Sequence, residues 1–184
     1  NFVEMFTNEQ LRHVYGEDAS KDTGPVGPAI DREIKTRDDR IHRHLNFLVN
    51  IDKIWNEDTM KETARNTFIG FYTALESGDM EKIKDKLYPN MFNGLKTEVE
   101  RRKATGMAFE YRNLCVRKVD IVLIRNYTDN TKDEYIVRIS AHAQKILTQN
   151  NVIVSKDEYV LPFEQYFIFG RLNNKWLLKE VIST

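Results

Sequence analysis

The stretch that decides the fold is 135–144, which reads YIVRISAHAQ. Apolar side chains occupy every second position from Tyr135 to Ala143, and from Arg138 onward polar side chains stand between them. Because successive side chains of a β-strand point to opposite faces, this alternation predicts a strand with one buried face and one face in water. We therefore expect an antiparallel sheet in the C-terminal half of the chain.

Further strands are expected on both sides of this stretch. Alternating apolar residues over 119–123 predict a strand that ends at the polar turn 126–133, and the aromatic-rich run 161–169 predicts a strand after it. Asn173 and Asn174 predict a tight hairpin into a last strand, since asparagine tolerates the positive φ that such turns require. Four strands that follow one another in the sequence predict an antiparallel meander.

The N-terminal half has helical spacing instead. Thr59 begins a capping-box pattern and a helix that Gly78 ends as a left-handed C-cap. Asp79 can cap a short helix, and Asn90 can cap another that runs up to Gly106. Helices followed by an antiparallel sheet predict the α+β class, with the N-terminal helices packed against a curved four-stranded antiparallel sheet.

The glycines and prolines of 16–28 indicate a linker. We therefore expect a short N-terminal helix and flexible linker over 1–29, followed by one α+β domain over 30–184. Because the sequence starts at Asn1 and shows no signal-peptide pattern, we expect it to be part of a longer protein.

The overall charge is balanced. Lys and Arg number 28, and Asp and Glu also number 28, so the chain as a whole does not attract phosphate backbones, and we expect no nucleic-acid partner. A single cysteine, Cys115, cannot form an internal disulfide. No apolar run reaches the roughly 18 residues that a membrane-spanning helix needs.

A sheet that wraps the helices would leave space beside the small residues Ala141 and Ala143, with phenylalanines as an aromatic wall. This predicts an apolar pocket that could hold a small apolar ligand. The other interpretation is ordinary close packing, with alanine admitting the bulky helix residues. The candidate lining residues are Phe68, Phe71, Tyr72, Tyr135, Ala141, Ala143, Phe163, Phe167 and Phe169.

Several motifs also resemble a known family. They are Asp39 and the region of Phe47, then Phe68 to Asp79 (FIGFYTALESGD), Leu87-Tyr88-Pro89, Val116 to Ile124, and Phe163 to Leu178 (FEQYFIFGRLNNKWLL). They resemble the Tim-forty-four-like family, the C-terminal domain of the mitochondrial presequence-translocase scaffold and its bacterial relatives, over about Ile30 to Val181. Gln165 stands where that family has an acid and Phe167 where it has Trp, whereas Phe169, Arg171, Trp176 and Leu178 keep the pattern.

This resemblance implies a cone-shaped, nuclear transport factor two-like fold. It also implies a non-catalytic, membrane-associated module for protein or lipid binding, of the kind used in protein transport, at the bacterial inner membrane or the mitochondrial matrix side. The expected partners are a protein or an anionic membrane surface. A homodimer through the solvent-exposed face of the sheet is a further possibility. On that face we expect Tyr166 and Ile168 to be exposed apolar residues that could contact a partner.

In that family the helices before the cone contact the membrane, which here corresponds to 34–54. Basic and apolar residues alternate there as in a helix at a lipid interface. The candidates are Arg40, Ile41, Arg43, Leu45, Leu48 and Val49. The other interpretation is a surface helix packed on its own domain, because acids such as Asp38 and Asp39 dilute the charge.

The sequence offers no convergent titratable groups, so we expect no catalytic residues, no metal and no cofactor. His42 and His44 are two residues apart, which on a helix points them to different faces. The alternative function is a small-molecule-binding or isomerase/dehydratase-type cone-fold protein that uses the apolar pocket.

Overall fold

The computed structural model describes residues 28–184, with side chains from residue 38 onward. Within these residues three α-helices come first and a sheet follows, so the predicted α+β class is confirmed. The helices are α2 (Pro28–Ile51), α3 (Glu57–Ser77) and α4 (Pro89–Ala104), and the short 3-10 helices are η3 (Lys53–Trp55), η4 (Met80–Lys86) and η5 (Asn130–Lys132). The strands are β1 (Met107–Arg125), β2 (Glu134–Gln149), β3 (Val152–Lys156), β4 (Leu161–Leu172) and β5 (Lys175–Ser183).

The N-terminal prediction lies mostly outside the described residues. The short helix and linker expected over 1–29 fall there except for the last two positions, where α2 has already begun at Pro28. Proline suits the first position of a helix, because its fixed φ is helical and the N–H that it lacks would have no partner there.

In the part of the chain that the structure describes, the sheet has five strands rather than the expected four. Its order is β1-β2-β4-β5, all antiparallel, and β3 pairs with the end of β2 from Ile146 to Gln149. Asn150 and Asn151 form the turn before β3, with φ values of 49° and 66°. All five residues of β3 are exposed, so this strand has no buried face and no alternating pattern by which the sequence could reveal it.

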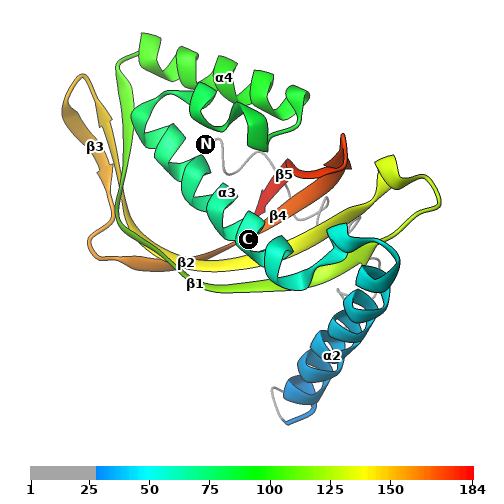
Figure 1. Ribbon diagram of the computed structural model, residues 1–184. Helices are drawn as coiled ribbons and strands as arrows, with labels where there is room; N and C mark the ends of the chain where they lie inside the picture. Colours follow the sequence, from blue (N-terminus) through cyan, green and yellow to red (C-terminus); the bar gives the residue numbers. More distant parts are fainter. Residues whose placement is uncertain (1–27) are drawn as a thin grey trace.

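The sheet curves around the helices, and α3 lies in its trough (Figure 1). Strand β1 is 19 residues long and has three register shifts against β2. Bulges of this kind bend a strand and increase its twist. The core between the helices and the concave face of the sheet is therefore continuous, and it includes Phe68, Phe71, Tyr135, Phe167 and Leu178.

Two helix starts differ from the prediction. Asn56 caps α3 by accepting a hydrogen bond from the Thr59 N–H at 2.9 Å, so the helix begins before the Thr59 capping box. Helix α4 begins at Pro89, and the expected cap Asn90 lies inside it. Asn56 stands three positions before Thr59 and provides the cap, and Pro89 stands one position before Asn90 and suits the first position of a helix. The C-cap at Gly78 is confirmed, with φ 72°.

Candidate functional site

Helix α2 buries one face and exposes another. Leu45 and Leu48 are 1% and 4% exposed and belong to the core, with Ile41 packed against it. Phe47 and Ile51 are 64% and 70% exposed, although they lie on the same turns of the helix. An apolar residue with so much exposed surface contributes little to the stability of the domain, so these two side chains are candidates for contact with a partner.

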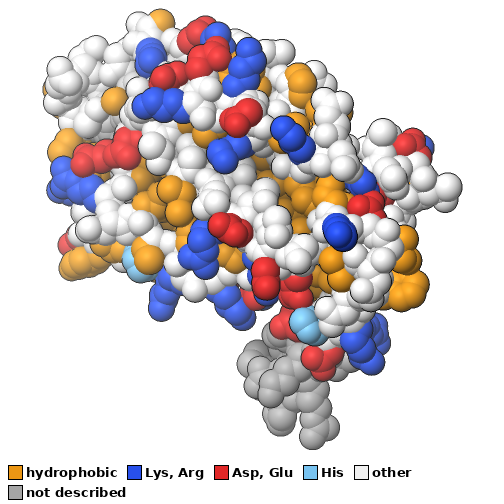
Figure 2. Space-filling model, in the orientation of Figure 1, with side chains coloured by type: hydrophobic (Ala, Val, Ile, Leu, Met, Phe, Trp, Pro, Cys, Tyr) orange, Lys and Arg blue, Asp and Glu red, His pale blue; other side chains and the backbone are white. Residues whose placement is uncertain are grey.

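Two arginines extend this exposed face. Arg40, Arg43, Phe47 and Ile51 follow one another at spacings of three and four residues, which places them on one side of a helix. We call these four residues the outward face of α2. Figure 2 shows hydrophobic side chains gathered over the C-terminal end of α2, with Lys and Arg side chains beside them.

The membrane-contact candidates divide between the two faces. Arg40 and Arg43 are exposed, as that role requires. Leu45 and Leu48 are buried in the core, and Ile41 and Val49 are partly buried, so the structure does not offer these leucines to a membrane. The apolar stripe of Ile41, Leu45 and Leu48 packs on the domain, and burial of this stripe holds the helix against the core.

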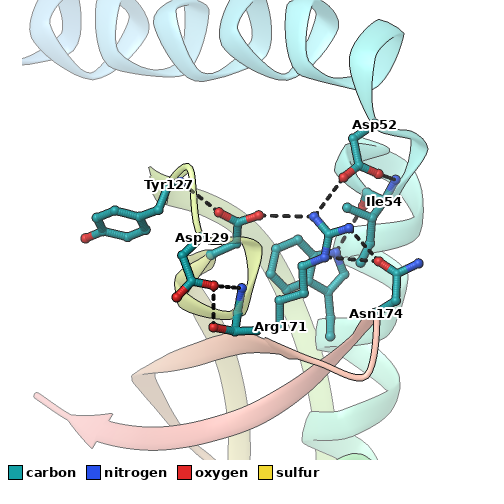
Figure 3. A network of polar contacts seen from close by, with 9 residues as sticks. Asp52, Ile54, Tyr127, Asp129, Arg171 and Asn174 are labelled. Atoms are coloured by element: carbon teal, nitrogen blue, oxygen red, sulfur yellow. Dashed lines mark hydrogen bonds and ion pairs between the residues drawn. The ribbon is translucent and has the colours of Figure 1, made fainter.

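A polar network fixes the end of α2. The Arg171 guanidinium donates through Nη1 to Asp52 Oδ2 at 2.7 Å and to Asp133 Oδ2 at 3.1 Å. Asn174 Oδ1 accepts from Nε and Nη2 of the same guanidinium (Figure 3). Asp133 is fully buried and Asp52 is half-buried, so one carboxylate anchors the arginine inside the protein and the other reaches it from the α2 end.

Backbone contacts complete the same junction. Asp133 Oδ1 accepts from the Tyr127 N–H at 2.7 Å, and the Asp133 carbonyl accepts from the Arg171 N–H at 3.0 Å. Trp176 donates its ring N–H to the Ile54 carbonyl at 3.0 Å. The turn between α2 and α3 is therefore held against the β4–β5 hairpin, and this fixes the direction in which the outward face of α2 points.

Sequence reasoning missed this network. Asp133 was assigned to a polar turn, and only the family pattern pointed to Arg171 and Trp176. The position of Asp133 could have indicated the network. Asp133 stands one residue before the buried strand β2, where a carboxylate is buried only if a basic side chain or hydrogen-bond donors pair with it.

A second contact joins α2 to α3. His42 Nδ1 lies 2.5 Å from Glu57 Oε2. Beside this pair is a cleft of about 230 Å³, lined mainly by polar residues. Within residues 28–184 no three His, Cys, Asp or Glu side chains are grouped so that they could hold a metal ion.

The predicted pocket residues are brought together on the concave face of the sheet. Phe163 is partly buried and the other eight are buried. Their rings are in contact: the Phe68 and Tyr72 centroids are 4.9 Å apart, and those of Tyr135 and Phe169 are 5.0 Å apart. The described clefts of about 110 and 230 Å³ are lined by other residues, so a pocket here stays a prediction.

The two buried tyrosines of this face have hydrogen-bond partners. The Tyr72 hydroxyl donates to Gln165 Oε1 at 2.7 Å, and the Tyr135 hydroxyl donates to the Met60 carbonyl at 2.9 Å. Burial raises the pKa of both hydroxyls well above the ordinary value, so both stay protonated. Gln165 thus accepts from a tyrosine at the position where the family pattern has an acid.

One ionisable group on the concave face was missed. Lys145 continues the inward series two residues beyond Ala143, and its ε-amino group lies 4.1 Å from the centre of the Phe163 ring. Burial lowers the pKa of this amine. Extending the alternation of β2 to its end would have found Lys145.

The expectation for the other sheet face was partly wrong. Ile168 is 4% exposed and packs with Ile136 and Ile182, and Tyr166 is partly buried against this small cluster. These side chains contact one another across neighbouring strands, which removes most of their surface from water. They are therefore not the exposed apolar candidates that the sequence suggested.

No helix among the described residues is long and apolar enough to cross a membrane. The chain has no match among curated proteins. The family model described as "Tim44-like domain" matches residues 43–183.

Three solved structures are similar to this chain at low identity. The intermembrane space region of the chloroplast protein ARC6 is 14% identical with a TM-score of 0.47, over 67% of this chain and 97% of that one. An NTF2-like protein of unknown function in nutrient uptake from Rhodospirillum rubrum is 13% identical with a TM-score of 0.39, over 65% and 97%. An NTF2-like protein from Cytophaga hutchinsonii is 13% identical with a TM-score of 0.38, over 70% and 99%.

The family model covers most of the chain, from the middle of α2 to the end of β5, and so includes both the polar network and the sheet. The chain belongs to the Tim44-like domain family.

Proposed function

We propose that this domain is a non-catalytic binding module that attaches to an anionic membrane surface through the outward face of α2. The observation that carries the proposal is the exposure of Phe47 and Ile51 beside Arg40 and Arg43. Such a helix can lie in the interface plane, with its apolar side chains at the acyl boundary and its cations among the headgroups. We place the module at the bacterial inner membrane or the mitochondrial matrix side.

The two acids of α2 whose side chains the structure describes are unequally placed for this contact. Asp38 and Asp39 line the cleft beside Glu57 and Asp120. Asp39 is also four residues before Arg43, whose Nε donates to the Asp39 carbonyl at 3.3 Å, so this acid stays next to the outward face of α2, whereas Asp38 lies on another side of the helix. The anchored end of α2 keeps this face directed away from the core, so little conformational entropy is lost when it meets a surface.

The expected strength is modest. Each arginine near an anionic surface contributes about 1 kcal/mol, and each apolar side chain contributes at most about 3 kcal/mol when fully buried. A contact of this size is reversible and weakens as salt rises. Stable attachment would require a second signal, such as a protein partner.

The non-catalytic part of the proposal rests on the concave face. The side chains gathered there are mostly aromatic and aliphatic, and the hydroxyls of Tyr72 and Tyr135 are already engaged in hydrogen bonds within the domain. General acid or base catalysis needs a group that can reach a substrate. The two tyrosines, whose hydrogen bonds are satisfied within the domain, are poorly placed for that role, and the Lys145 amine on this face lies against the Phe163 ring.

Vesicle flotation tests the membrane contact. The chain should float with vesicles that contain anionic phosphatidylglycerol, and float less with neutral phosphatidylcholine vesicles or at high salt. The double variant F47S/I51S and the double variant R40Q/R43Q should each reduce flotation. Equal flotation on both kinds of vesicle, or full flotation of both variants, would contradict the proposal.

Helix α3 provides a matched control. Arg65 and Ile69 are exposed and four residues apart, like Arg43 and Phe47. The variant R65Q/I69S removes the same chemistry from another helix. It should float as well as the unchanged chain, and an equal loss would show that any exposed basic and apolar pair supports the binding.

A further inference from the structure

The convex face of the sheet, which is the face opposite α3, carries a small buried apolar cluster. Ile136, Ile168 and Ile182 are 1%, 4% and 1% exposed. Their neighbours along the strands, such as Val137 and Phe167, belong to the core on the concave face, so the three isoleucines point the other way. The cluster is therefore dry although it lies on the face that the alternation of β2 predicts to be in water.

The described helices and strands do not account for this burial. The hydrophobic side chains packed against the three isoleucines come from β1 and β4 and are Val122, Leu123 and Tyr166. Within residues 28–184, no hydrophobic side chain of α2, α3 or α4 belongs to this cluster. Side chains of neighbouring strands cover one another's flanks, but the end that points away from the sheet needs atoms above it. This points to a further layer over the cluster.

The cover is limited to part of the convex face. Ser140 and Glu164 pair across β2 and β4 on the same face, four residues along the strands from the pair Ile136 and Ile168. Ser140 is only partly buried and Glu164 is exposed. The strand pairing is the same at both places, so pairing alone does not explain why one pair is dry and the other is in water. A single segment that crosses the face beside the isoleucines would explain the difference.

Arg138 lies between these two pairs and gives the covered area a polar requirement. Its Nη2 donates to Asp120 Oδ2 at 3.2 Å, whereas its Nε is buried and has no hydrogen-bond partner in the described part of the chain. A buried donor without an acceptor destabilises a protein. The covering segment should therefore combine apolar side chains with an acceptor, and an acid is the strongest acceptor for a guanidinium.

Residues 1–15 of the same chain have this composition. They read NFVEMFTNEQLRHVY, in which seven of the fifteen side chains are apolar and Glu4 and Glu9 are the acids. The sequence predicts a short helix here, with Leu11, Val14 and Tyr15 on one side. The linker composition of 16–28 then separates this segment from the domain.

The linker is long enough to bring the segment to the convex face. Ile41 packs against the core and is 13 residues after Pro28, which is about 20 Å along a helix. Helix α2 packs against β1, and two strand spacings, about 10 Å, separate β1 from β4. Residues 16–27 span about 40 Å when extended. The chain can therefore return from Pro28 to the cluster.

We propose that residues 1–15 bind the convex face of the sheet in the same chain, over Ile136, Ile168 and Ile182, with an acid of the segment beside Arg138. The contact buries apolar side chains of both partners and gives the Arg138 Nε an acceptor. It also occupies the sheet face first considered for a homodimer, so a partner can use that face only when residues 1–15 leave it. The outward face of α2 takes no part in this contact.

Paramagnetic broadening of nuclear magnetic resonance signals in the full chain tests the proposal. A nitroxide is attached at N8C in a C115S background, which removes the native exposed thiol. The methyl signals of the three buried isoleucines should lose most of their intensity. Those of Ile69 on α3 and Ile153 on β3, which are exposed, should keep theirs. Broadening at Ile69 or Ile153 with the three buried isoleucines unchanged would overturn the proposal.

A matched pair of variants tests the apolar character of the contact. The variant L11D/V14D places two acids at apolar positions of the segment and should restore the signals of the buried isoleucines. The control T7D/Q10D places the same two acids, with the same spacing, at polar positions and should leave the broadening unchanged. Broadening that survives L11D/V14D, or that both variants remove equally, would contradict the proposal.

A mixed sample separates binding within one chain from binding between two copies. It contains isotope-labelled chain without the nitroxide and unlabelled chain that carries it. The signals of the three buried isoleucines should keep their intensity in this sample. Broadening there would assign the contact to a second copy and would overturn the proposal.

Discussion

The two faces of α2 carry similar side chains in opposite surroundings. Leu45 and Leu48 are buried in the core, whereas Phe47 and Ile51 are mostly exposed. The buried face attaches the helix to the domain, and the Arg171 network closes the junction at its end. Hydrophobicity alone therefore does not locate a binding surface, because the residues that stabilise the fold and the residues exposed to a partner belong to the same helix and differ only in their exposure.

Removing Arg171 should have the largest effect on stability. The variant R171M leaves the fully buried carboxylate of Asp133 without its cation. Removing one partner of a buried ion pair typically costs about 3–5 kcal/mol, because the remaining charge stays in a poorly solvating interior. Urea unfolding measures this loss. The control K179M removes a cation that is about half exposed and should change the free energy of unfolding by less than about 1 kcal/mol. A loss below about 1 kcal/mol for R171M would mean that the network does not hold the junction.

The buried face of α2 should rank next. The variant L45A removes a side chain that is 1% exposed, and such truncations cost about 2–5 kcal/mol through lost burial and the cavity left behind. The matched variant F47A removes a larger side chain from the same helix but should cost less than about 0.5 kcal/mol. Urea unfolding of the two variants checks the comparison directly, and equal losses would show that the two faces do not differ.

The acid at the α2 end of the network should matter less than the acid in the interior. The variant D52N keeps an oxygen that can accept the Ile54 N–H but weakens the contact with Arg171, and should cost about 1 kcal/mol. The variant D133N should cost more, because Asp133 is fully buried and Asp52 is half-buried. Urea unfolding of D52N and D133N compares their free energies of unfolding and tests whether the buried Asp133 contributes more to the network than Asp52 does. The opposite order would mean that Asp52, just after α2, contributes more to the network than Asp133 does.

Much of the fold was predictable because burial repeats with a fixed period. The alternation of 135–144 gave β2, and the Asn173–Asn174 hairpin was found where two asparagines allow positive φ, here 51° and 59°. Strand β3 has no buried side, so its five residues carry no such pattern. The dipeptide Asn150–Asn151 could have predicted the turn before β3, because both residues have positive φ, as Asn173 and Asn174 do.

The candidate site was harder to predict. The sequence identified α2 and its arginines but assigned the membrane contact to Leu45 and Leu48, since an apolar stripe looks the same whether it meets the core or a lipid surface. Only the packed structure shows which stripe is already used. The Arg171 network was only partly predictable: the position of Asp133 before β2 suggests a paired acid, but its partner could not be named, because Asp52, Asp133 and Arg171 are brought together by tertiary packing from distant parts of the chain.

The smallest expected effect on stability is at the outward face of α2, which should differ most from the buried face of the same helix. The variants F47S and I51S remove exposed apolar surface that contacts water in the free domain, so each should change the free energy of unfolding by less than about 0.5 kcal/mol. Urea unfolding and the thermal midpoint check this. Because the fold is then unchanged, any loss of vesicle flotation in F47S/I51S comes from the surface itself. If either variant is destabilised as much as L45A, that face supports the fold and its exposure is not evidence for a partner.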